Sequence, residues 1–246
     1  MKHVRWQVLL SVGLIGLSAA LYYVHFMIFK DAHHIFLYLI GDIAFIPIDV
    51  LLVTLILHQI ISKHEKQNML KKMNMVIGAF FSESGMQLLR FLCYFDKNIG
   101  SLKQKLVFDK NWQQKDFDAV ILTLKSHGYD IDARKGDLAA LRGFLILHRS
   151  FLLGLLENPN LLEHEDFTGL LWAVFHLADE LSARATVSGL PDADLEHLSG
   201  DIKRAYSILI VQWFTYMKHL QKDYPYLFSL AMRTNPFDAG ASVIMK

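Results

Sequence analysis

The sequence has a single cysteine, Cys93, so no disulfide can form within one chain. This agrees with a reducing compartment such as the cytoplasm. Several catalytic motifs are also absent from the sequence: Gly-x-Ser-x-Gly, the phosphate-binding Gly-x-x-x-x-Gly-Lys and the zinc-binding His-Glu-x-x-His. No strand pattern, internal repeat or low-complexity segment stands out. We therefore expect neither a cofactor nor one of these enzyme classes.

Charged residues are nearly absent from two long stretches near the N-terminus. Trp6–Phe29 has no Asp, Glu, Lys or Arg, and the 31 residues of Ala32–Ser62 contain two, Asp42 and Asp49. About 20 apolar residues in a helix cross the hydrocarbon core of a bilayer. We predict two transmembrane helices that form an antiparallel hairpin, because the connection between them is short. A signal peptide is disfavoured, since the apolar run is too long and no small-x-small cleavage site follows it.

Basic residues set the predicted orientation of this hairpin. Lys2 and Arg5 precede the first span, and the cluster from Lys63 to Lys72 follows the second, whereas the connection offers Lys30 alone. Basic residues near membrane spans favour the cytoplasmic side. We therefore expect a multi-pass protein of the inner (plasma) membrane with both termini in the cytoplasm.

Asp42 and Asp49 are the candidate intramembrane polar site. They are seven residues apart, so two helical turns place them on roughly one face. A carboxylate at membrane depth costs a few kcal/mol and usually faces a protein interior or water. Two interpretations stay open: a structural contact between helices, or a path for ions or protons.

The fold class that we predict is all-α, with an N-terminal two-helix transmembrane hairpin followed by a cytoplasmic helical bundle domain. The predicted divisions are a hairpin over 1–62 with spans at about 6–29 and 35–61, an amphipathic juxtamembrane helix over 63–96, a cytoplasmic domain over 97–237 and a tail over 238–246.

Within the predicted cytoplasmic region, three local features carry expectations. Asn111 is a candidate helix cap. The almost wholly apolar segment 138–157 is the expected centre of the core. Gly78 and Gly85 are either a weak point of their helix or a notch for close packing.

Acidic residues are concentrated in Glu157–Asp201, which has ten of them and one basic residue, Arg184. This is either an ordinary solvated surface or a docking face for a partner or a neighbouring subunit. The candidate docking residues are Glu163, Glu165, Asp166, Asp179 and Glu180. Segment 63–110 is basic instead and suits anionic lipid headgroups. It has no nucleic-acid recognition motif, so we expect no nucleic acid partner.

Several histidines and carboxylates between residues 164 and 197 are candidate ligands for a metal ion. The residues weighed for it are His164, Glu165, Asp166, His176, Glu180, Asp194 and His197. His176 and Glu180 are four residues apart and can face one ion. A di-iron helical bundle needs Glu-x-x-His on two helices, and this motif does not occur in the sequence. We therefore expect no metal site, with His176 and Glu180 as the nearest candidates, and favour an exposed ion pair.

Two stretches, Glu-Asn-Pro-Asn-Leu-Leu-Glu-His-Glu at 157–165 and Tyr-Pro-Tyr-Leu-Phe-Ser-Leu at 224–230, resemble uncharacterised prokaryotic two-span membrane proteins. The resemblance covers the distal cytoplasmic region and implies no activity.

Our leading hypothesis is a membrane-anchored helical scaffold or sensor. It is expected to be homo-oligomeric and non-enzymatic, to contact the lipid bilayer and to offer a protein partner a cytoplasmic surface. The alternative is a subunit of an oligomeric ion channel or transporter that uses Asp42 and Asp49, since one hairpin cannot enclose a pore. A metal-dependent enzyme is a more distant third.

Overall fold

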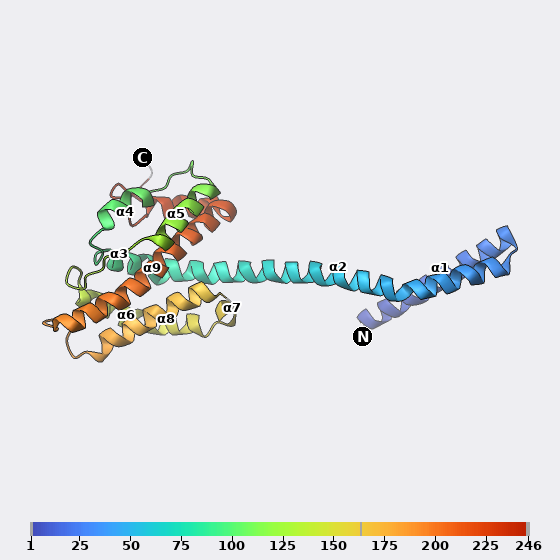
Figure 1. Cartoon of the computed structure of the whole chain (residues 1–246), viewed down its shortest axis with the longest axis horizontal. Coiled ribbons are helices and arrows are strands. Elements are labelled where there is room, and N and C mark those ends of the chain that lie inside the picture. The colour runs from blue at the N-terminus through green and yellow to red at the C-terminus, as the bar shows by residue number, and fades with distance from the viewer. Residues whose placement is uncertain (1, 163, 245–246) are drawn as a thin grey trace. The chain divides into compact units, whose positions relative to one another are not determined.

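The computed structural model describes residues 2–162 and 164–244, which fold into helices joined by loops (Figure 1). The helices are α1 (Lys2–Phe29), α2 (Ala32–Phe80), α3 (Met86–Cys93), α4 (Ile99–Leu106), α5 (Gln114–Ser126), α6 (Leu138–Leu156), α7 (Pro159–Leu162), α8 (Glu165–Ala183), α9 (Asp192–Asp223) and α10 (Pro225–Arg233), with a π-helical turn η1 (Phe81–Gly85) between α2 and α3. No strand forms in the described ranges, so the predicted all-α class is confirmed. The chain divides into two compact units, Met1–Lys66 and Gln67–Lys246.

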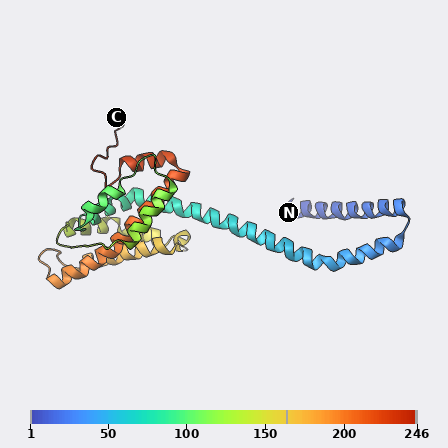
Figure 2. The ribbon, with the colours of Figure 1, turned by 45° about the horizontal axis from the view of Figure 1, so that its top comes forward.

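In the first unit, α1 and the beginning of α2 run in opposite directions (Figure 2). The turn between them is formed by Lys30 and Asp31. Lys30 has a φ of 50° and donates its N–H to the carbonyl oxygen of Phe26 at 2.8 Å, which ends α1 with a left-handed residue. The carboxylate of Asp31 accepts the N–H of His34 at 3.2 Å and so caps the first turn of α2.

The apolar side chains of this first unit are largely uncovered. Leu9, Ile15 and Ile40 are each about two-thirds or more exposed, at 69%, 70% and 67%. By length and composition, three helical segments of the described chain can cross a membrane: Trp6–Phe29, the apolar part of Ala32–Cys93, and Leu138–Leu156. The last of these, α6, packs against α8 in the second unit, where part of its apolar surface is buried.

The second unit is built around α9, which packs against α8, α5, α10 and α3. In Figure 1 its ribbon runs between those of α5 and α8. Leu198, Ile202, Leu209 and Trp213 follow one another at helical spacing and are fully buried. These positions form the inward-facing stripe of α9.

The expectation that segment 138–157 forms the centre of the core is wrong. This helix, α6, packs mainly against α8 and leaves Ile146, Leu147 and Leu153 exposed. Its apolar residues surround the helix on almost every side, so the pattern does not show which face is covered. The position of α9 depends instead on contacts from several helices that are distant in sequence.

The second unit begins at Gln67 and not at residue 97. Met73, Ile77 and Phe80, at the end of α2, are buried in its core together with Phe81 of η1. α2 therefore runs without a break through Ser62 and into this core. The segment assigned to a juxtamembrane helix supplies core residues from both α2 and α3.

The first turns of α5 and α8 are held by side-chain caps. The start of α5 is capped by Gln113 and not by Asn111, because Gln113 and Asp116 form a reciprocal capping box in which Asp116 accepts the N–H of Gln113 at 2.7 Å. α8 starts at Glu165 with His164 as its cap, whose ring nitrogen accepts the N–H of Phe167 at 3.1 Å.

Candidate functional site

Two histidines and two carboxylates meet where α8 and α9 lie side by side. His176 and Glu180 are one turn apart on α8, and His197 and Asp201 are one turn apart on α9. One side-chain donor atom from each residue lies within 4.8 Å of the others. We call these four residues the His–carboxylate cluster. The loop after α8 turns the chain back, which sets these two pairs against each other.

Asp201 is the buried centre of this cluster. The Nε2 atom of His176 lies 3.4 Å from its Oδ1, and the Nε2 atom of His197 lies 3.3 Å from its Oδ2. The carboxyl of Asp201 is 3% exposed, whereas the two imidazoles are about half exposed. Oδ2 accepts no hydrogen bond of good geometry from any residue in the described ranges. Burying a carboxylate oxygen without a donor costs free energy, so this atom marks a place where a cation would be stabilised.

Glu180 completes the cluster from the α8 side. Its Oε1 lies 3.9 Å from Nε2 of His176, and its Oε2 lies 3.6 Å from Nε2 of His197. Arg184 binds the same Oε2 through Nη1 at 2.8 Å, and this hydrogen bond holds the pKa of Glu180 below its usual value. Glu180 is therefore ionised at neutral pH and keeps Oε1 turned toward His176.

Two arginines hold the carboxylates of the cluster from outside. Nη1 of Arg204 donates a hydrogen bond to Oδ1 of Asp201 at 3.1 Å. Arg184 reaches Asp194 as well as Glu180, and its hydrogen bond lowers the pKa of Asp194. Arg184 contacts Oε2 of Glu180, and Arg204 contacts Oδ1 of Asp201. This leaves one oxygen of Glu180 and one of Asp201 for a ligand.

The residues of the predicted acidic docking face lie in different surroundings. Glu165 and Asp166 are exposed in the first turn of α8, where acidic side chains favourably meet the helix dipole. Asp179 is paired with Arg149 at 2.9 Å, and Glu180 belongs to the His–carboxylate cluster. Glu163 lies outside the described residues. Two of the five acids are thus neutralised by neighbouring arginines.

Asp42 and Asp49 both lie on α2, with Pro47 inside the helix between them. Both carboxylates are exposed, and neither has a hydrogen bond or ion pair with any residue of the described chain. The hairpin of a single chain therefore gives Asp49 no protein partner.

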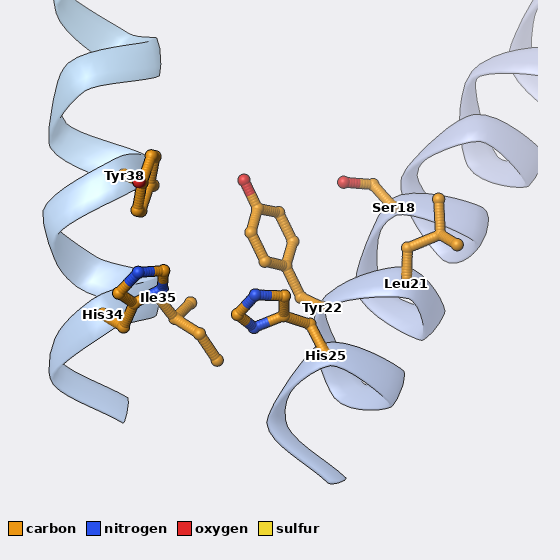
Figure 3. Close-up of a pocket in the computed structure, with 7 residues that line it drawn as sticks. All are labelled: Ser18, Leu21, Tyr22, His25, His34, Ile35 and Tyr38. Carbon is orange, nitrogen blue, oxygen red and sulfur yellow. The ribbon is translucent and has the colours of Figure 1, made fainter. Parts of the chain in front are cut away.

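A pocket of about 390 Å³ opens between α1 and α2 near their connection. Figure 3 shows His25 of α1 and His34 of α2 pointing toward each other, with Tyr22 and Tyr38 above them. The two imidazoles stack at 6.0 Å between ring centroids, and the Nδ1 atom of His25 is buried with no hydrogen-bond partner in the described ranges.

Two family profiles match this chain, one described as the C-terminal helical domain of the uncharacterized protein MJ1433, over residues 69–233, and one as its N-terminal helical domain, over residues 1–61. Uncharacterized protein MJ1433 of Methanocaldococcus jannaschii is 43% identical over 244 residues, which cover 99% of this chain and 98% of that protein. The chain belongs to the MJ1433 family. The resemblance to an uncharacterised family is thereby confirmed, and it brings no activity with it. No solved structure matches the chain.

In this member of the MJ1433 family, the sequence pointed to three of the four residues of the His–carboxylate cluster. His176 and Glu180 form a recognisable pair, whereas His197 pairs by spacing with Asp194 and not with Asp201. Asp201 was missed because it lies in an apolar stripe of α9. A usable signal was present, since His-x-x-x-acid occurs at 176–180 and again at 197–201 in consecutive helices.

Proposed function

We propose that this chain is an integral membrane protein in which α1 and the first part of α2 form a hairpin that anchors the second compact unit at the cytoplasmic face of the plasma membrane. The anchored unit acts as a homo-oligomeric scaffold or sensor that presents its surface to a protein partner.

The observation that carries this proposal is the exposure of apolar side chains throughout the first unit. Leu9, Ile15 and Ile40 are typical of it. Exposed apolar surface costs about 25 cal/mol per Å² in water, whereas in lipid it carries no such cost. Apart from the carbonyl that Pro47 leaves without a donor, the backbone groups of both segments are paired within helices, which a lipid environment requires. The basic residues around 63–72 support the cytoplasmic orientation.

Alkaline carbonate extraction of membranes from cells that express the full chain tests the anchor. We expect the full chain to stay in the membrane pellet, and a chain that starts at Gln67 to be released. Release of the full chain would overturn the proposal. Reporter fusions at both termini test the orientation, and a reporter signal from outside the cytoplasm at either end would contradict it.

A second candidate function is that of a subunit in an oligomeric ion channel or transporter. The observation that favours it is the lack of any partner for Asp42 and Asp49 in the described part of the hairpin. Carboxylates within a bilayer normally face protein or water, so several hairpins must then enclose them. Ion flux in liposomes that depends on Asp49, and is altered by Asp49→Asn with assembly unchanged, would support this function over the scaffold.

A further inference from the structure

The His–carboxylate cluster brings two kinds of donor to one point from two helices. Imidazole nitrogens come from His176 and His197, and carboxylate oxygens from Glu180 and Asp201. The shortest nitrogen-to-oxygen distances between them are 3.3 and 3.4 Å, followed by 3.6 and 3.9 Å. Around an ion with donors at about 2.0–2.1 Å, neighbouring donors of a tetrahedral site lie roughly 3.4 Å apart. These nitrogen-to-oxygen distances lie within about 0.5 Å of that value and involve both oxygens of each carboxylate. One donor atom from each residue lies within 4.8 Å of the others, so a bound ion would draw the four donors closer together.

We propose that the His–carboxylate cluster is a binding site for one divalent first-row transition metal ion, held between α8 and α9 by His176, Glu180, His197 and Asp201. The site lies wholly within the second compact unit. The inference therefore stands independently of the membrane anchor.

The contacts of Asp201 argue for a cation at this point. Both imidazoles present Nε2, one to each oxygen of the same buried carboxylate. A neutral imidazole with its proton on Nδ1 offers a lone pair at Nε2, and two such lone pairs facing a carboxylate repel it. A proton on each Nε2, or one metal ion shared by all four residues, removes this repulsion. The buried Oδ2 without a hydrogen bond of good geometry favours the shared ion.

The surroundings of the cluster also resemble those of metal sites. Ligating carboxylates in such sites are usually held by hydrogen bonds from an outer shell of residues. Arg184 plays this part for Glu180, and Arg204 plays it for Asp201, at 2.8 and 3.1 Å. Both arginines also offset the negative charge that the carboxylates would otherwise bring together. The two half-exposed imidazoles leave one side of the site open to solvent.

The donor set selects the class of ion. Mg²⁺ and Ca²⁺ prefer oxygen ligands, and a pair of imidazoles is foreign to their sites. Soft thiolate ligands do not contribute to the cluster. Two nitrogens with two oxygens suit Zn²⁺ and its first-row neighbours such as Mn²⁺, Fe²⁺ and Co²⁺. Zn²⁺ is thus a suitable first probe, with Mg²⁺ as the negative control ion.

The test measures metal binding by the full chain, purified in detergent without a polyhistidine tag and stripped with a chelator. Zn²⁺ is added by equilibrium dialysis, and bound metal is counted by elemental analysis. Because the chain has 12 histidines, stoichiometry alone does not identify the site. His176→Ala and His197→Ala change half-exposed side chains, so both variants are expected to fold. The matched control is Glu196→Gln, because Glu196 is exposed and lies next to His197 on α9.

We expect one tightly bound Zn²⁺ per chain in the unmodified protein and in Glu196→Gln, and no tight binding of Mg²⁺. Each histidine variant should weaken the affinity by more than about tenfold, and the double variant should abolish tight binding. Added Co²⁺ should give the visible spectrum of a protein-bound ion, and this spectrum should disappear in the double variant. The proposal is overturned if the stripped protein takes up no Zn²⁺, or if the double variant binds it as well as the unmodified chain does.

Discussion

The guanidinium of Arg184, just after α8, binds the carboxylate of Asp194 in the first turn of α9, with Nε 2.9 Å from Oδ2 and Nη2 against Oδ1. Through Nη1 the same side chain also holds Glu180. Arg184 is the one basic residue of the acidic segment from Glu157 to Asp201. Its two contacts fasten the turn that sets α9 against α8, and so they position the His–carboxylate cluster.

Arg184→Lys should destabilise the second unit by about 1–2 kcal/mol. A lysine ammonium cannot reproduce the planar, two-point contact with Asp194, and charge-assisted hydrogen bonds of partly buried groups are the stronger ones. Chemical or thermal unfolding of the variant measures this effect. Arg149→Gln is the control, because it removes the exposed pair with Asp179 and should cost less than about 1 kcal/mol. Equal effects of the two substitutions would contradict the role given to Arg184.

Gly85→Ala should destabilise the second unit by about 1–3 kcal/mol. A methyl group at this position would lie 2.6 Å from a ring carbon of Phe80 and 2.8 Å from one of Phe81, both fully or nearly fully buried. At Gly85 the close-packing expectation is confirmed, and the π-helical turn Phe81–Gly85 also interrupts the α-helix there. Gly143→Ala on α6 is the control: nothing lies within 4 Å of the added methyl, so helix propensity should leave this variant unchanged or more stable. A stable Gly85→Ala variant would show that the two rings can move aside.

The helices of the second unit could be predicted well because their stripes are regular. Phe167, Leu170 and Val174 of α8 repeat at helical spacing and are fully buried, while Trp172 on the other side is exposed. The central position of α9 could not be predicted in this way, since it depends on which helices fold back upon it.

The candidate site was less predictable than the helices. His176 and Glu180 share one helix, so their spacing reveals them. His197 and Asp201 join them only because the turn after α8 aligns the two helices. A buried aspartate in an apolar stripe is easily taken for an exposed residue, since burial follows from packing and not from the local sequence. The exposed positions of Asp42 and Asp49 could not be foreseen either, because they depend on where α1 lies.

The thiol of Cys93 should resist alkylation in the folded protein at mildly alkaline pH. Burial raises its pKa from about 9 to about 11, opposed in part by nearby Lys103. Its Sγ donates a hydrogen bond to the carbonyl oxygen of Arg90 at 3.1 Å. Because Cys93 is the chain's single cysteine, mass spectrometry after iodoacetamide treatment reports on it alone. Rapid modification near pH 8, with the fold intact, would contradict a buried neutral thiol.

The same shift predicts how stability changes with pH. The raised pKa means that the thiol stays neutral in the folded chain while the unfolded chain ionises. Its contribution is therefore complete below about pH 9 and is lost as the pH rises toward 11. The loss should be on the order of 2–3 kcal/mol, at 1.36 kcal/mol per pKa unit. Cys93→Ala removes this titration, so its stability should fall less steeply over that interval. Parallel curves for the two proteins would contradict the shift.

A fragment of residues 67–246 should fold, whereas one of 97–237 should not. The shorter fragment, which the sequence suggests, lacks Ile77, Phe80 and Phe81 as well as Leu88, Leu89 and Leu92 of α3. All six side chains are buried in the core that α9 organises. Truncation of one large buried apolar side chain costs about 2–5 kcal/mol, and a whole domain is stable by about 5–15 kcal/mol, so the loss of six exceeds what the fold can tolerate. Circular dichroism and cooperative thermal unfolding of both fragments measure this difference. A cooperative transition in the 97–237 fragment would show that α3 and the end of α2 cover a core that is already complete, and the unit would then begin where the sequence placed it.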